Sequence, residues 1–275
     1  LKIATLYLLI RKSQDRQGVQ KTAELFGDII DNQVENYQLN APCAEEFIEL
    51  LKYYMYQLPT EQKDAFLTKM KKIGQDLLSS LTDKTKKDDF DVWIFLAFGK
   101  NAVQLYKFEE AKKILNSGVT LAKSKNNAHR LAELEIQLGY LYSYLEDKEQ
   151  TRVHWNEACL NFSGMNFYET VLNYVYKGNV ELIKGNFTKS NAMCDELNKL
   201  YESKDSYDYL KSISNDFISN SLILEFVDKG EYSQNKIEEI IFILERFRTL
   251  TLMYDINAYL HAAYKSLVFY KYLLE

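Results

Sequence analysis

The residues that could do chemistry in this chain are few and scattered. Its three histidines (His129, His154 and His261) have no histidine partner at the third or fourth following position, so no helix carries a two-histidine metal site. The sequence contains no Gly-x-Ser-x-Gly turn and no phosphate-binding loop. Acidic pairs such as Glu109-Glu110 point to different faces of a helix. These patterns predict a protein that is not an enzyme and needs no metal or other cofactor.

The cysteines and the charge restrict the compartment and the partners. Cys43, Cys159 and Cys194 are widely spaced and form no Cys-x-x-Cys pair, so we expect reduced thiols and a cytoplasmic protein. The apolar run at residues 3–10 is too short to span a membrane. A net charge of −5 argues against a nucleic-acid surface. Because the chain opens on Leu1 without a methionine, we expect a fragment, and DNA binding only through a segment absent from it.

The elements that position any binding residues are expected to be helices. Of 275 residues, 47% are hydrophobic and only two are proline, a composition that favours long helices over turn-rich sheets. Gly99, Gly139 and Gly178 each lie inside an apolar helical run, at intervals of about 40 residues. Twelve positions after each glycine stands a small residue. Periods of this size predict a helical repeat array, which works through an extended surface.

Apolar positions spaced three and four residues apart divide the chain into helix pairs. We predict a single domain over residues 1–275, all-α, with the pairs stacked as an α-solenoid. Residues 79–89 are rich in lysine and aspartate, and we expect them to form a solvated loop. At Lys184-Gly185-Asn186, a glycine in the left-handed conformation is expected to end a helix. The predicted units are N-terminal helices at 1–40, pairs at 43–82, 92–124, 130–163, 167–202 and 207–248, and a terminal helix at 255–274.

The units resemble tetratricopeptide repeats. The unit at residues 130–163 matches best. Its first helix has the family's leucine and glycine at Leu138-Gly139, and Tyr142 also matches. Its second helix has the family's aromatic at Trp155 and its alanine at Ala158. Phe98-Gly99, Ala111 and Leu115 match the same places in the preceding unit. The departures are Thr151 in place of alanine, Lys177 in place of leucine and the absence of the proline that closes a repeat. The resemblance covers about 60% of the chain and implies a right-handed superhelix of helix pairs.

The long, proline-poor repeats in a chain rich in lysine, asparagine, isoleucine and tyrosine are also similar to the peptide-sensing cytoplasmic regulators of Gram-positive bacteria. This group contains the Rgg, PlcR, Rap and AimR proteins. The resemblance implies quorum sensing and transcription regulation: a short signalling peptide binds the concave face and changes assembly or partner binding. Apolar residues in the last helices suggest a homodimer through the C-terminal end.

In this fold the concave face is lined by fixed places of each first helix, and the glycines set the register. Amides suit an extended peptide because each both donates and accepts a hydrogen bond, and tyrosines add stacking area with a polar tip. The predicted peptide-binding residues are Trp93, Lys100, Gln104, Glu133, Gln137, Tyr140, Tyr144, Tyr176, Asn179 and Asn220.

Other functions stay open at this stage. Repeats that grip a C-terminal carboxylate need lysine and asparagine where this chain has Leu96, Gln137, Leu172 and Tyr176, so that clamp is not present. An adaptor that binds a folded protein on its convex or terminal surfaces remains an alternative to the peptide receptor. A third reading is a Rap-like modulator of a phosphorelay protein, acting through the N-terminal helices.

Overall fold

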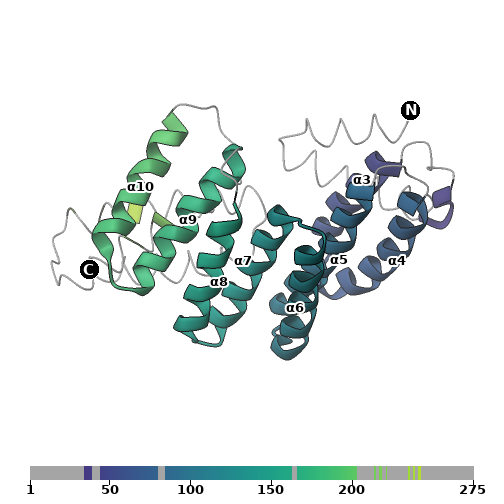
Figure 1. The fold of residues 1–275 in the computed structure, drawn as a ribbon, viewed down its shortest axis with the longest axis horizontal. Coiled ribbons are helices and arrows are strands. Elements are labelled where there is room, and N and C mark those ends of the chain that lie inside the picture. Colours follow the sequence, from purple (N-terminus) through teal and green to yellow (C-terminus); the bar gives the residue numbers. More distant parts are fainter. Residues whose placement is uncertain are drawn as a thin grey trace. The chain divides into compact units, whose positions relative to one another are not determined.

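The fold is all-α in the part of the chain that the structure describes. This structure is a computed structural model, and it describes residues 34–38, 44–79, 84–162 and 166–202 with single positions 214, 217, 218, 221, 235, 238, 241 and 242. Within these residues every regular element is helical and no strand occurs. Figure 1 shows the helices in chain order. The predicted segments 1–40, 207–248 and 255–274 lie wholly or mostly outside the described residues.

The chain divides into two compact units, residues 1–145 and 146–275. In the first unit α3 packs on α4, α4 on α5, α5 on α6 and α6 on α7, and α5 also contacts α7 directly. In the second, α9 packs against both α8 and α10. The boundary between the two units falls within the predicted helix pair 130–163, and the single domain over residues 1–275 stays a prediction. The helices are α3 Ala44–Gln57, α4 Thr60–Ser79, α5 Lys84–Gln104, α6 Phe108–Ser124, α7 Ala128–Tyr144, α8 Lys148–Asn161, α9 Phe167–Ile183 and α10 Phe187–Glu202.

Helix α5 begins eight residues earlier than the sequence pattern predicts, at Lys84 rather than residue 92. The expectation of a loop through residue 89 is therefore wrong for residues 84–89. These charged residues have partners on other helices: Lys86 pairs with Glu45 of α3, and Asp89 pairs with Arg130 of α7. A charged segment whose side chains find partners can stay helical without an apolar face.

Three turns between successive helices share one hydrogen-bond pattern. The second residue after each helix takes a left-handed conformation: Tyr106 (φ 57°), Asn126 (φ 51°) and Gly185 (φ 72°). In each turn the next amide donates to a carbonyl five residues back, as from Asn186 to Glu181 at 2.9 Å. This arrangement satisfies helix-end carbonyls that would otherwise lack a donor. The predicted left-handed glycine at Gly185 is confirmed, and the same geometry at Tyr106 and Asn126 has no glycine to signal it.

The repeated glycine allows two helices to approach closely. A Cβ atom added to Gly99 of α5 would lie 2.3 Å from Cδ2 of Leu115 on α6. Leu115 is fully buried, so its side chain fills the space over the glycine. In the second unit, a Cβ at Gly178 would lie 2.0 Å from Cζ of Phe217. The glycine pattern therefore marks contacts between helices.

Candidate functional site

Helix α7 carries a stripe of polar and aromatic side chains along one face. Arg130, Glu133, Gln137, Tyr140 and Tyr144 follow one another at intervals of three or four residues, the spacing that places side chains in one row. All five are half-buried or exposed. The apolar residues of the helix are instead buried and hold it in the first unit: Leu131, Leu134, Leu138 and Leu141. We call the row formed by Arg130, Glu133, Gln137, Tyr140 and Tyr144 the α7 stripe.

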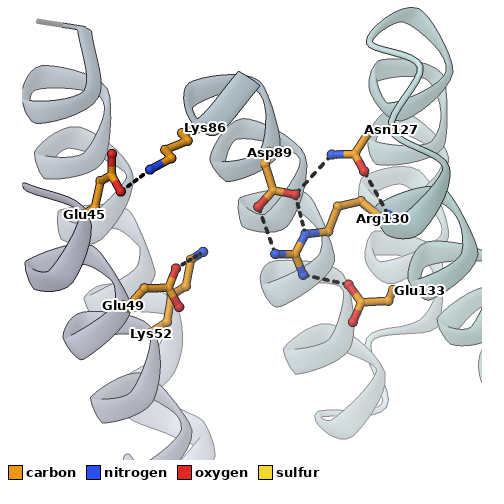
Figure 2. A network of polar contacts seen from close by, with 8 residues as sticks. All are labelled: Glu45, Glu49, Lys52, Lys86, Asp89, Asn127, Arg130 and Glu133. Atoms are coloured by element: carbon orange, nitrogen blue, oxygen red, sulfur yellow. Dashed lines mark hydrogen bonds and ion pairs between the residues drawn. The ribbon is translucent and has the colours of Figure 1, made fainter. Parts of the chain in front are cut away.

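One end of the stripe is charged, and we name Asp89, Arg130 and Glu133 the charged end (Figure 2). The Arg130 guanidinium donates to both Asp89 oxygens, at 2.8 and 2.9 Å, and to Glu133 Oε2 at 2.7 Å. Asn127 links the two helices further, because its Nδ2 donates to Asp89 and its Oδ1 caps α7. The charged end therefore ties α5 to α7 through a two-pronged ion pair.

The electrostatics of the charged end follow from these contacts. Burial alone would raise the pKa of Asp89, but the hydrogen bonds and charge of Arg130, with a hydrogen bond from Asn127, outweigh it and hold that pKa below its usual value. Burial would likewise lower the pKa of Arg130, and the two carboxylates raise it instead. Asp89 and Arg130 are therefore both charged at neutral pH.

A second set of contacts lies beside the charged end, between α3 and α5. Lys52 donates to Glu49 at 2.7 Å, and its Nζ lies 5.1 Å from the centre of the Trp93 ring. Figure 2 shows the Glu45–Lys86 and Glu49–Lys52 pairs near the charged end. Trp93 also stacks on Phe90, with ring centres 6.0 Å apart.

Trp93 is predicted to contact a ligand, but only 3% of it is exposed. The glycine register gives the face of α5 on which it stands and does not give what covers that face. In this structure Trp93 is a core residue, with Lys52 Nζ over its ring, and it is not open to a ligand.

The other end of the stripe is aromatic, and we name Tyr106, Phe108 and Tyr144 the aromatic end. Their three ring centres lie 6.0 to 6.1 Å from one another. Phe108 and Tyr144 are nearly parallel at 22°, and Tyr106 stands across both at 87° and 77°. Tyr106 is 71% and Tyr144 53% exposed, so the cluster presents ring surface to solvent. Burial raises the pKa of the Tyr144 hydroxyl, as does the neighbouring Tyr106.

The remaining predicted residues of the first unit lie between the two ends or beside them. Gln137 and Tyr140 are half-buried in the middle of the stripe. Lys100 is half-buried on α5 and Gln104 is exposed at its end. Lys100 also acts on Lys63 of α4: burial lowers the pKa of Lys63, and the charge of Lys100 lowers it further. Because α5 contacts α7, these residues stand on adjacent helices.

The predicted residues of the second unit are placed differently. Tyr176 is 3% exposed and packs against Trp155 with ring centres 5.6 Å apart, so it is a core residue in this structure and is not open to a ligand. Trp155 is buried as the repeat template predicts. Asn179 is half-buried and donates to the Val175 carbonyl of its own helix at 3.0 Å. Asn220 lies outside the described residues.

Sequence reasoning missed the charged end except for Glu133. Asp89 fell in the segment expected to be a loop, and Arg130 lay at the edge of a predicted helix. A signal was present in the spacing: the pairs Glu45–Lys86 and Asp89–Arg130 are both 41 residues apart. Trp93 also stands 41 positions after Lys52, its cation partner. A search of the sequence for opposite charges one repeat apart would have found the two ion pairs.

The described residues contain no group of three or more histidine, cysteine or acidic side chains that could hold a metal ion. Burial raises the pKa of the Cys159 thiol to about 12, which suppresses the reactive thiolate. Both described cysteines, Cys159 and Cys194, are buried. The α7 stripe and the α5 residues beside it form a row of groups that can donate or accept hydrogen bonds, carry charge or stack on a ring.

Comparison with family models and with curated proteins finds no match to this chain. Among the described helices, none is both long enough and apolar enough to cross a membrane.

Proposed function

We propose that this chain is a non-enzymatic binding module whose helices stack as a tetratricopeptide-like α-solenoid, and that a short peptide binds along α5 and α7. The observation that carries the proposal is the α7 stripe, which keeps five polar or aromatic side chains in one accessible row. Such a row suits an extended ligand, which presents a new side chain and peptide group every few ångströms.

The solenoid is supported by three features of the first unit. Helix α5 contacts α4, α6 and also α7, as the first helix of one repeat contacts the first helix of the next. Ion pairs at a spacing of 41 residues join the same helices, α3 to α5 and α5 to α7. The close approach at Gly99 repeats the helix contact that the tetratricopeptide resemblance implies. A stack of such units leaves one face of the first helices for binding.

The middle of the stripe fits the backbone of a peptide. The Gln137 amide donates and accepts at once, so it can bind a peptide group without a charge of its own. Tyr140 and Tyr144 add flat surface that is ordered at low entropic cost. Lys100 and Gln104 on α5 extend this surface sideways. Resemblance to the peptide-sensing regulators extends the proposal to a cytoplasmic sensor in which peptide binding changes assembly or partner binding.

Native mass spectrometry of the full chain, purified from its host lysate, tests this function. We expect a co-purified peptide of roughly five to ten residues, the length that fills a surface of this kind. The variant Gln137→Ala should lose most of the bound peptide, and Asn116→Ala, an exposed change on α6, should retain it. Purification with a large protein and no small ligand would contradict the receptor function.

A protein-binding scaffold is the second candidate, and the aromatic end favours it. Clustered, exposed tyrosines are enriched where proteins meet, because each combines an apolar ring with a polar tip. Tyr106 and Tyr144 have that character. A protein partner whose binding is lost on Tyr106→Ala and kept in Gln137→Ala would favour the scaffold over the receptor.

A further inference from the structure

The two ends of the α7 stripe differ in chemistry, and a ligand lying along it would meet both. The ends are 14 residues apart along one helix, from Arg130 to Tyr144, which corresponds to about 21 Å. An extended chain covers that length in about six residues. A ligand of that size therefore contacts charged groups with one terminus and aromatic rings with the other.

The charged end has a surplus of negative charge, because two carboxylates, Asp89 and Glu133, share the single Arg130 guanidinium (Figure 2). His129 lies 3.9 Å from Glu133 and adds charge only when protonated. The Asp89 side chain is 35% exposed and the Arg130 side chain 16%. Asp89 Oδ1 accepts from Arg130 and Asn127, and Oδ2 accepts from Arg130. A carboxylate oxygen has two lone pairs, so Oδ2 can accept a second hydrogen bond, here from a cation of the ligand.

The aromatic end offers ring faces and edges with no formal charge. Tyr106 holds its exposed ring in a left-handed backbone conformation that bulky residues rarely adopt. The equivalent turns carry Asn126 and Gly185, whose backbones adopt it at lower cost. Folding of the turn does not require a tyrosine there, and its ring completes the exposed cluster.

We propose that the peptide bound by this chain is polarised: an ammonium or guanidinium group contacts Asp89 and Glu133, and an aromatic or large aliphatic side chain about six residues away packs on Tyr106, Phe108 and Tyr144. This inference rests on the proposed peptide-binding function. It adds the charge, the direction and the length of the ligand. An acidic peptide is disfavoured because its carboxylates would face the surplus negative charge.

The test is affinity selection on the full chain with an equimolar positional library of hexapeptides, read by mass spectrometry. We expect retained peptides to be enriched in lysine or arginine at one terminal position and in phenylalanine, tyrosine or leucine at the other. Glu133→Gln should cut the lysine and arginine enrichment about threefold, the size of a partly exposed charge contact, and leave the aromatic enrichment unchanged. Tyr144→Ala should cut the enrichment in phenylalanine, tyrosine or leucine about fivefold and leave the lysine and arginine enrichment unchanged.

Glu157→Gln on α8, an exposed residue with the same change of charge, serves as the control and should alter neither enrichment. Circular dichroism of each variant confirms the fold. Retention without a charge preference, or a preference that Glu133→Gln leaves intact, would overturn the polarised ligand and leave the peptide-binding function standing. If no hexapeptide is retained, both the inference and the proposed function are overturned.

Discussion

Arg130 joins two helices because it is held by carboxylates on both. Asp89 comes from α5 and Glu133 from α7, and the guanidinium lies between them, largely buried. A buried cation that loses one partner keeps its desolvation cost and loses part of the compensation. Replacing Asp89 should therefore lower the free energy of unfolding more than any other change at the charged end.

We expect Asp89→Asn to lower the free energy of unfolding at pH 7 by about 1 kcal/mol, a value discounted because a third of the carboxylate is exposed. The folded state holds the pKa of Asp89 below that of an unfolded chain, about 3.9. Its contribution is complete above the unfolded pKa and is lost as the pH falls through the folded pKa. The gap between variant and parent should therefore narrow as the pH falls below about 3.9.

Urea unfolding from pH 7 downward measures that gap. Glu149→Gln is the matched control, because Glu149 also pairs with an arginine, Arg152, at the fully exposed surface. We expect no measurable change there. A gap at Asp89→Asn that persists unchanged at the lowest pH would show that the ion pair is not its source.

At the residue scale the sequence predicted part of the candidate site. The glycine register placed Glu133, Gln137, Tyr140 and Tyr144 on one face of α7, and all four are half-buried or exposed. Trp93, predicted on the same basis, is buried, and Lys52 of α3 lies over its ring. Periodicity within a helix carries no information about that contact. The 41-residue spacing between a side chain and its partner on another helix does carry that information, and it is seen only when one repeat is compared with the next.

At the element scale, close helix packing and the turns set the geometry. Two of the three repeat glycines, Gly99 and Gly178, lie where a neighbouring side chain occupies the space of a Cβ atom. The turns place a residue in the left-handed conformation whether or not it is glycine. Sequence patterns located the helices well, since apolar spacing reports on burial. They missed the start of α5 because its first turns are held by ion pairs.

Gly99→Ala should lower the free energy of unfolding by about 1–2 kcal/mol. Overpacking against the buried Leu115 costs about 1–3 kcal/mol, and the better helix propensity of alanine returns up to about 1 kcal/mol. Chemical unfolding measures the change, with the exposed Ser117→Ala as control. The double variant Gly99→Ala with Leu115→Ala should be less destabilised than the sum of the two single variants, because truncating Leu115 removes the overlap with the new methyl group. Additive effects would mean that the glycine does not contact Leu115.

Glu146→Gly should raise the free energy of unfolding by about 0.5–1 kcal/mol. Glu146 is exposed and takes a φ of 58° in the turn after α7, a conformation that glycine adopts without strain. Glu157→Gly, in the interior of α8, should shift stability by a similar amount in the opposite direction. Thermal unfolding of both variants checks this; destabilisation at both positions would contradict the turn geometry.

At the scale of the whole molecule, the all-α class follows from composition and periodicity, and the described residues agree with it. The division into residues 1–145 and 146–275 could not be foreseen, because the repeat pattern runs across it without a break in composition. Within the first unit, ion pairs, close packing and the α7 stripe all involve α5 or α7. The central proposal is that these two helices present a peptide-binding surface.

Photo-crosslinking from the middle of the α7 stripe tests that proposal most directly. A benzophenone amino acid replaces Gln137 in the full chain, with Asn116 on the exposed face of α6 as the matched position. After irradiation in host lysate, we predict adducts of short peptides, roughly five to ten residues, at position 137 and none at 116. Only large protein adducts at 137, or the same peptides at both positions, would contradict the account.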